Sequence, residues 1–212
     1  MLKKLTLIIS CALLLSACGS KTKTTNNQPT STPQTGGVWE IAELEKPYIS
    51  LTPTSDGHWL NLKITKLPTT ISAIEYELIY NALDNNIEIE KGVSGTIKSQ
   101  EISTTIERKL LLGTESCTSG CKYKYDTGVI GGTLSINFIS QDGKTATYES
   151  AFTLKSTASL KKEGFLKLET ENYSLKTSVS SGSDYYLLLK NYNGVYSVFS
   201  SNNNSPLVGD HQ

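Results

Sequence analysis

Apolar and polar residues alternate with a period of two along most of the chain after residue 38, which is the pattern of β-strands that bury one face. In residues 58–64 this alternation places Leu60, Leu62 and Ile64 on one face. The segment 71–83 could be taken for a helix, but its β-branched residues and tyrosines favour a strand. We expect further strands at residues 48–52, 87–90, 102–112, 128–139 and 145–155.

Short polar segments interrupt these apolar runs. Gly92 and Gly95 indicate a bulge or a sharp bend within one of the strands. Seven or eight short strands in about 110 residues are typical of a β-sandwich. The sequence therefore predicts an all-β fold, an antiparallel and immunoglobulin-like β-sandwich over residues 38–156. Its tight turns are expected at residues 54–57, 84–86 and 141–144.

After residue 156 the apolar residues become sparse, but one hairpin is clearly indicated. Residues 185–192 and 195–200 flank Asn193-Gly194, a dipeptide that favours type I′ turns because both residues tolerate positive φ. An isolated hairpin is only marginally stable in water. It must therefore pack on the sandwich, join a second sheet or await a partner.

We favour a small C-terminal β subdomain for this region. The segments 165–168 and 173–175 are short enough to form a second sheet with the hairpin. The subdomain would then span residues 157–201 as an extension of the sandwich. Residues 202–212 are expected to form a disordered tail, because they contain few apolar residues.

The amino terminus has the organisation of a secretory signal peptide. Lys3 and Lys4 form a short basic region, and residues 5–17 are a 13-residue apolar run that ends in small residues. A helix needs about 20 apolar residues to cross a bilayer, so this run is too short to be a transmembrane helix. We expect residues 1–17 to direct export of the chain.

The apolar run ends in Leu15-Ser16-Ala17-Cys18-Gly19, which resembles the lipobox of bacterial lipoproteins. The resemblance implies cleavage after residue 17 and a diacylglycerol thioether on Cys18, which would hold the protein at the cell membrane or cell surface, outside the cytoplasm. Two or more acyl chains form a stable anchor. The alternative is an ordinary secretory signal followed by an incidental cysteine.

Residues 18–37 are expected to form the lipidated cysteine and a flexible tether. The segment 20–37 is rich in Thr, Ser, Asn, Gln and Pro and has no aromatic or aliphatic residue that could be buried. A coil of this length spans roughly 25 Å.

Without residues 1–17 the chain has 18 basic and 20 acidic residues, so its formal charge is −2. This balance excludes a nucleic-acid binder that acts by bulk positive charge.

Cys117 and Cys121 are the two cysteines that remain once Cys11 leaves with the signal peptide and Cys18 is lipidated. A short loop containing Ser and Gly separates them, and exported proteins meet oxidising conditions, so we predict a disulfide at a hairpin tip. A metal site would need more ligands, and the chain has only two histidines, both far away in sequence. A redox motif would need a helix amino terminus beside the first thiol. We therefore expect no metal and no cofactor.

No complete set of catalytic residues is present, so we expect a protein without catalytic activity. Glu75 with Glu77, or Glu88 with Glu90, would share a strand face and could in principle act as the acid and base of a glycan hydrolase. Carboxylates on strands far more often simply face solvent than take part in catalysis. Arg108, the sole arginine, is expected to form a structural ion pair with a strand carboxylate.

Aromatic side chains provide one candidate binding surface. Trp39, Trp59, Tyr123 and Tyr125 could stack on sugar rings or anchor a protein partner if they are exposed. The alternative is that they fill the core or cover its rim.

Several segments resemble a family of uncharacterised lipoproteins from ultrasmall candidate-phylum bacteria. The resemblance covers about 80 residues and implies export, a β domain and a structured turn containing cysteine, but that family has no established activity. The segments are residues 48–53, 56–58, 76–80, 108–113, 117–126 and 128–129.

Together these patterns predict a lipid-anchored extracytoplasmic β-sandwich protein with a binding role or a structural role in the envelope. Its expected partners are the membrane, through the lipid, and an envelope protein or glycan, but no nucleic acid. One alternative is a surface protein that binds or hydrolyses glycan. Another is a subunit of an envelope complex in which the hairpin of residues 185–200 adds to a partner's sheet.

Overall fold

The computed structural model describes residues 36–177 and 182–202, all of which belong to one compact unit, Thr35–Gln212. The expected signal peptide, Cys18 and nearly all of the tether lie outside the described residues. The expected tail also lies outside them from residue 203 onward.

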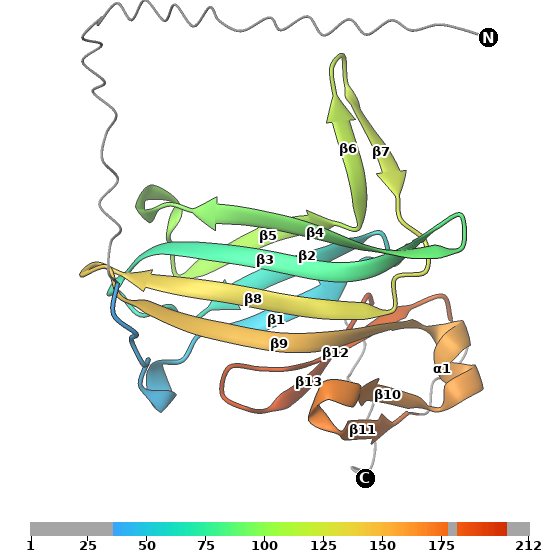
Figure 1. Cartoon of the computed structure of the whole chain (residues 1–212). Helices are drawn as coiled ribbons and strands as arrows, with labels where there is room; N and C mark the ends of the chain where they lie inside the picture. Colours follow the sequence, from blue (N-terminus) through green and yellow to red (C-terminus); the bar gives the residue numbers. More distant parts are fainter. Residues whose placement is uncertain (1–35, 178–181, 203–212) are drawn as a thin grey trace, which may run out of the picture. The chain divides into compact units, whose positions relative to one another are not determined.

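A six-stranded antiparallel sheet forms the larger layer of the fold (Figure 1). Leu134, Ile136 and Phe138 of β8 (Gly131–Ser140), one of the two central strands, are fully buried, and the residues between them face outward. This alternation is the one expected for strands with one buried face. The strand order is β13 (Tyr196–Ser200), β12 (Tyr185–Lys190), β9 (Thr145–Ser156), β8 (Gly131–Ser140), β3 (Ile71–Asp84) and β4 (Ile87–Ile97).

A three-stranded sheet forms the second layer, in the order β1 (Tyr48–Pro53), β2 (Trp59–Thr65) and β5 (Thr105–Leu111). Leu60, Leu62 and Ile64 of β2 have no exposed surface and share one hydrophobic core with the inner residues of the larger sheet. The predicted all-β sandwich and the common face of these three residues are confirmed. The immunoglobulin-like topology stays a prediction.

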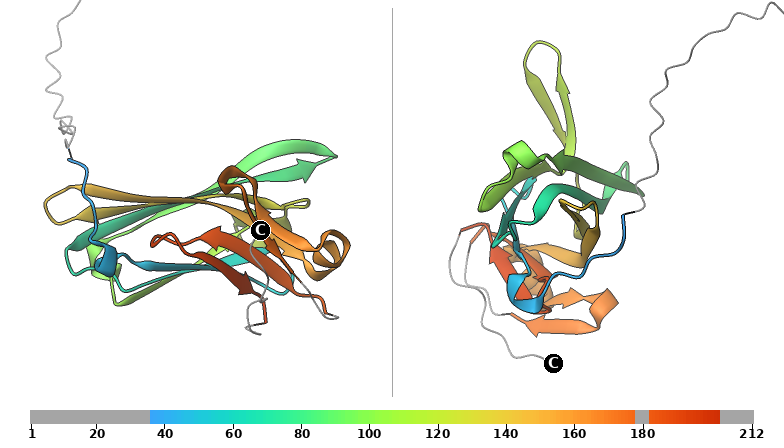
Figure 2. Two further views of the ribbon diagram at one scale, coloured as in Figure 1. Left: turned by 90° about the horizontal axis from the view of Figure 1, so that it is seen from below. Right: turned by 90° about the vertical axis from the view of Figure 1, so that its left-hand side faces the viewer.

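A short helix and a small sheet cover part of the outer face of the larger sheet. The helix α1 (Thr157–Glu163) leads into β10 (Phe165–Leu168) and β11 (Tyr173–Lys176), and the right-hand view of Figure 2 shows this part of the chain beneath the sandwich. Leu160, Leu166, Leu168 and Leu175 pack there on Leu188 of β12 in a second hydrophobic core.

The hairpin of residues 185–200 belongs to the main sheet, which corrects the prediction of a separate subdomain over residues 157–201. Its first strand, β12, pairs with β9 as well as with β13. Leu187 and Leu189 enter the sandwich core, whereas Leu188 enters the second core on the other face. A strand that is buried on both faces needs consecutive apolar residues, and the three leucines provide them.

The bend predicted at Gly92 and Gly95 is wrong, because β4 pairs with β3 in continuous register through both residues. The register shift in β3 lies between Ile71 and Ala73 instead. Gly95 is paired with Tyr76, and a Cβ atom at residue 95 would lie 2.4 Å from the Tyr76 hydroxyl oxygen. Glycine is therefore needed here so that the tyrosine ring can cross the neighbouring strand.

The helix α1 was not predicted from the sequence. The Ser156 hydroxyl accepts a hydrogen bond from the backbone N–H of Ser159 and caps the amino terminus. Gly164 ends the helix with φ 78°, in the left-handed region that favours glycine. Three single turns of 3-10 helix, η1 (Glu43–Glu45), η2 (Ser99–Glu101) and η3 (Glu169–Glu171), complete the described part.

Candidate functional site

A two-stranded hairpin projects from the sandwich and is exposed along nearly its whole length (Figures 1 and 2). It consists of β6 (Gly113–Cys117) and β7 (Cys121–Tyr125). Cys117 and Cys121 are directly opposite each other, with Cα atoms 4.1 Å apart, and form a disulfide. The predicted disulfide at a hairpin tip is therefore present.

The two faces of the hairpin differ in chemistry. The pairing of residue 113 with 125 and of 115 with 123 puts Glu115, Tyr123 and Tyr125 on one face, together with the disulfide. Lys122 and Lys124 lie on the opposite face with threonine and serine. The hairpin thus has an aromatic face and a basic face.

Tyr123 and Tyr125 pack against Trp59, the first residue of β2, and His58, which precedes it. We call these four residues the aromatic platform. Tyr125 stacks on His58 with ring centroids 3.9 Å apart, and Tyr123 meets Trp59 edge to face at 5.4 Å. The Lys109 ammonium group lies 4.6 Å from the centre of the Trp59 ring, an arrangement that favours a cation. Three of the four aromatic residues singled out from the sequence therefore meet at one place.

His58 is the member of the platform that sequence analysis missed, although its place beside Trp59 was a signal. Its Nδ1 atom lies 3.3 Å from the Asp56 carboxylate. The Asp56 carboxylate also accepts hydrogen bonds from the Thr54 hydroxyl and the backbone N–H of His58. These bonds, above all the one from Thr54, lower the pKa of Asp56 because they stabilise its charged form. A hydrogen bond to Glu115 raises the pKa of Tyr123.

The base of the hairpin is fixed to the larger sheet by Asp126. Its side chain is only 6% exposed and pairs with the Lys91 ammonium group of β4 at 2.5 Å. The Tyr80 hydroxyl of β3 donates a hydrogen bond to the other carboxylate oxygen at 2.9 Å. Burial, followed by this bond to Asp126, raises the pKa of Tyr80. The hairpin is therefore joined to both layers, through the aromatic platform and through Asp126.

Trp39 lies at the other end of the fold and is not part of the platform. Its backbone N–H donates to the Thr145 carbonyl oxygen at 2.8 Å, at the start of β9. This end of the sheet is marked by the pairing of Ile71 with Ser140, nine residues along β3 from Tyr80. At about 3.3 Å per residue the two ends are roughly 30 Å apart. Trp39 instead lines a separate cavity of about 460 Å³ with Lys46 and Tyr192.

The chain matches no family model, no curated protein and no solved structure. Within the described residues, no helix has the length and apolar character needed to cross a membrane.

The strand carboxylates are exposed on the outer face of the larger sheet. Glu75 and Glu77 border a hollow of about 320 Å³ whose other lining residues are mostly serine, threonine, asparagine and glycine. Glu88 accepts a hydrogen bond from the Asn81 amide at 2.5 Å. A glycan hydrolase typically holds its carboxylates in a cleft where aromatic rings bind the sugar, and the surroundings of these carboxylates differ from such a cleft.

Arg108 pairs with Glu101 at 2.6 Å, so the expected structural ion pair is present. Its partner lies in the turn η2 rather than on a strand. The pair joins the segment after β4 to β5, where the chain passes from one sheet to the other.

Glu115 and the two cysteines of the hairpin tip place three ligand-type atoms within 4.8 Å of one another. Both sulfur atoms are joined in the disulfide, however, and a metal is bound by the thiolate form. In this oxidised form the cluster is therefore a structural feature of the tip.

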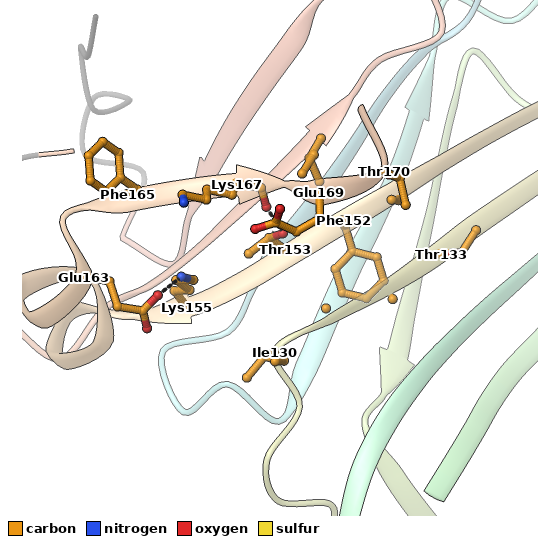
Figure 3. Close-up of a pocket in the computed structure, with 14 residues that line it drawn as sticks. Ile130, Thr133, Phe152, Thr153, Lys155, Glu163, Phe165, Lys167, Glu169 and Thr170 are labelled. Atoms are coloured by element: carbon orange, nitrogen blue, oxygen red, sulfur yellow. Dashed lines mark hydrogen bonds and ion pairs between the residues drawn. The ribbon is translucent and has the colours of Figure 1, made fainter. Parts of the chain in front are cut away.

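A cavity of about 750 Å³ lies between the outer face of β8 and β9 and the edge of β10 (Figure 3). The rings of Phe152 and Phe165 border it, and Lys155 forms an ion pair with Glu163 at one end. Its volume is within the range of small-molecule sites. Its lining combines apolar side chains with charged residues and threonines, and sequence analysis did not single out these residues.

Proposed function

We propose that this protein is a lipid-anchored, extracytoplasmic binding protein that holds a protein partner in the cell envelope through the β6–β7 hairpin. The observation that supports this proposal best is the hairpin itself, an exposed ribbon that is closed by a disulfide. Two of its tyrosines pack on His58 and Trp59. The side chains of Tyr123 and Tyr125 are 42% and 39% exposed. Partly exposed tyrosines on a rigid element are typical anchors of protein interfaces.

Anchoring is supported by the sequence of the amino terminus. The apolar run of residues 5–17 leads into the lipobox-like segment ending at Cys18 and Gly19. The disulfide between Cys117 and Cys121 fits an oxidising compartment outside the cytoplasm. A chain held at Cys18 would remain at the membrane because acyl chains provide a stable anchor.

The position of the hairpin supports a role in display. The described chain begins at Gly36, and the carbonyl oxygen of Gly37 accepts a hydrogen bond from the Thr145 N–H at the end of the sheet near Ile71. The hairpin base is bonded to Tyr80, roughly 30 Å along β3 from that end. An anchor upstream of residue 36 would therefore leave the hairpin at the end of the domain away from the point of attachment.

The anchor is tested with the full chain and the variant Cys18→Ser. We expect the wild-type protein in the membrane fraction, with a mature amino terminus at Cys18 whose mass includes the lipid. The variant should leave the membrane fraction or retain residues 1–17. A wild-type chain that keeps residues 1–17 and carries no modification would contradict the proposal.

The binding role is tested by cross-linking in intact cells with the variant Tyr123→Ser. We expect recovery of the cross-linked partner to fall at least tenfold, because the variant removes the most exposed ring of the aromatic platform. Tyr48→Ser is the matched control, since Tyr48 is 40% exposed and lies on β1 outside the platform. Equal recovery with both variants would rule out the hairpin as the binding element.

A further inference from the structure

The first residues of β4 form an exposed edge with an alternating sequence, Ile87-Glu88-Ile89-Glu90. β4 is the last strand of the six-stranded sheet, so one of its edges has no strand partner in the described part of the chain. The pairing of β3 with β8 ends at Tyr80, and beyond it the β3–β4 ribbon is bridged on the β3 side at Leu83, by Thr127. Ile87 is 67% exposed, which is unusual for a large apolar side chain.

The strand β7 has the complementary alternation, Lys122-Tyr123-Lys124-Tyr125. It pairs with β6 on one side, and its other edge has no strand partner among the described residues. The main-chain groups on a free edge can bond to a further strand. Neither lysine forms an ion pair within the described part, and the same is true of Glu88 and Glu90.

We propose that β7 of one copy of this protein pairs antiparallel with β4 of a second copy. The register that matches charge and apolar character at every position pairs Lys122 with Glu90, Tyr123 with Ile89, Lys124 with Glu88 and Tyr125 with Ile87. Opposite charges and aromatic–β-branched pairs directly across two strands are stabilising. The lysines would then meet the glutamates on one face of the new ladder, and the tyrosines would meet the isoleucines on the other.

The same sequences disfavour pairing of either edge with itself. Two β7 strands centred on Tyr123 would place Lys122 opposite Lys124, and two β4 strands centred on Ile89 would place Glu88 opposite Glu90. Like charges directly opposite each other are destabilising. The interface is therefore heterologous, with a different edge contributed by each copy.

The overlap is only four residues long, so the contact is weak between free molecules. Copies held on one membrane meet at a much higher effective concentration, which favours short interfaces of this kind. In this respect the inference rests on the proposed anchoring, and it names a second copy as one partner of the hairpin.

The contact is tested first with the full chain in its membrane, with natural residues at every position. Cells are moved from normal to heavy-nitrogen medium part-way through expression, so that one membrane holds copies of both masses, and a carbodiimide is used to join carboxylates directly to nearby amines. We expect mixed-isotope peptides in which Lys124 is linked to Glu88 or Lys122 is linked to Glu90. Links at these residues only within single copies, or no links, would overturn the inference.

Charge reversal provides the second test, using two differently tagged copies. When both copies carry K122E/K124E, or both carry E88K/E90K, co-purification of the second copy should fall at least tenfold. When one copy carries the first pair of substitutions and the other carries the second pair, opposite charges meet again and co-purification should recover. The double variant E75K/E77K is the matched control, because it reverses two exposed charges on β3 away from both edges and should change nothing.

The outcomes separate this inference from the proposed function. If the charge-swapped copies do not co-purify, the inference is overturned. A loss of cross-linking between another envelope protein and the Tyr123→Ser variant would still support the binding role. Conversely, the charge-swapped copies could co-purify in a chain that proves to have no lipid on Cys18. That result would support the inference and remove the anchor from the proposed function.

Discussion

Tyr125 and His58 lie face to face, with ring planes only 1° apart and centroids 3.9 Å apart. The contact joins the last residue of β7 to the residue that precedes β2, 67 positions earlier in the chain. Because no residue of the hairpin belongs to either hydrophobic core, such contacts at its base determine how rigidly it is held.

Tyr125→Ala should loosen the hairpin without unfolding the sandwich. A stacked aromatic pair contributes about 1 kcal/mol beyond surface burial, which corresponds to about a fivefold change in local opening. We therefore expect hydrogen exchange of the β7 amides to accelerate by about this factor, while Tyr125→Phe, which keeps the ring, exchanges as the wild type. Equal exchange in the alanine variant and the wild type would contradict a supporting role for the stack.

Removal of the disulfide by Cys117→Ser together with Cys121→Ser should also act locally. Closing so short a loop stabilises a folded hairpin by about 2 kcal/mol in the chain-entropy view, or about 30-fold in local opening. We expect amide exchange in residues 114–124 to accelerate up to this limit, with the midpoint of global urea unfolding almost unchanged. A large shift of that midpoint would show that hairpin and sandwich unfold as one unit.

The alternation of apolar and polar residues predicted the sandwich well because one-sided burial leaves a period of two in the sequence. The register of Leu60, Leu62 and Ile64 in β2 follows directly from it. The hairpin that contains β12 was predicted, but the place of β12 in the main sheet was not, because its leucines are buried on both faces and therefore do not alternate. The same reasoning also missed α1, which has only seven residues and is defined mainly by its caps at Ser156 and Gly164.

The candidate site was predicted only in part, because its residues come together through pairing between distant strands. Aromatic character was enough to single out Trp59, Tyr123 and Tyr125, which the structure brings together. No spacing in the sequence indicates that Asp126 would be buried against Lys91, or that Trp39 would lie at the other end of the sheet. These relationships follow from the register of β3, β4 and β8.

Asn191 replaces a missing strand partner for β1, and its loss should destabilise the whole sandwich. Its side-chain amide donates to the Ile49 carbonyl oxygen at 2.6 Å and accepts from the Ile49 N–H at 3.2 Å. Asn191 is 4% exposed, so Asn191→Ala would leave both backbone groups buried without a partner, at a cost of about 2–3 kcal/mol. Asn191→Asp should be at least as harmful, since a carboxylate cannot donate to Ile49.

Urea unfolding followed by circular dichroism measures this loss. Asn61→Ala is a suitable control, because Asn61 lies at an exposed position of β2. A free energy of unfolding within about 0.5 kcal/mol of the wild type for Asn191→Ala would contradict the assigned role.

Asp126→Ala should destabilise the base of the hairpin more than Tyr125→Ala or removal of the disulfide. It would leave the Lys91 ammonium group, 26% exposed, without its carboxylate and the Tyr80 hydroxyl without its acceptor. Loss of one partner of a largely buried pair costs about 2–4 kcal/mol. Lys91→Met with Asp126→Leu, which removes both charges, should recover part of the stability, and the recovered part is measured by urea unfolding of the double variant.

Stability should fall steeply in alkaline solution because two buried tyrosines ionise far more readily in the unfolded chain. Burial raises the pKa of Tyr80 and of Tyr148, which are 2% and 3% exposed. Their stabilising effect is complete below the unfolded pKa of about 10 and declines as pH rises from there towards the folded pKa. Each tyrosine should then lower the free energy of unfolding by about 1.4 kcal/mol per pH unit.

Tyr148→Phe isolates the contribution of one of these groups. At pH 7 the variant should lose about 1 kcal/mol, since the Tyr148 hydroxyl donates to the Lys190 carbonyl oxygen at 2.8 Å. Above pH 10 its stability should fall less steeply than that of the wild type by about 1.4 kcal/mol per unit, so the two curves converge and then cross. Tyr48→Phe, at an exposed position, should keep the wild-type slope, and an unchanged slope for Tyr148→Phe would show that this hydroxyl ionises equally in both states.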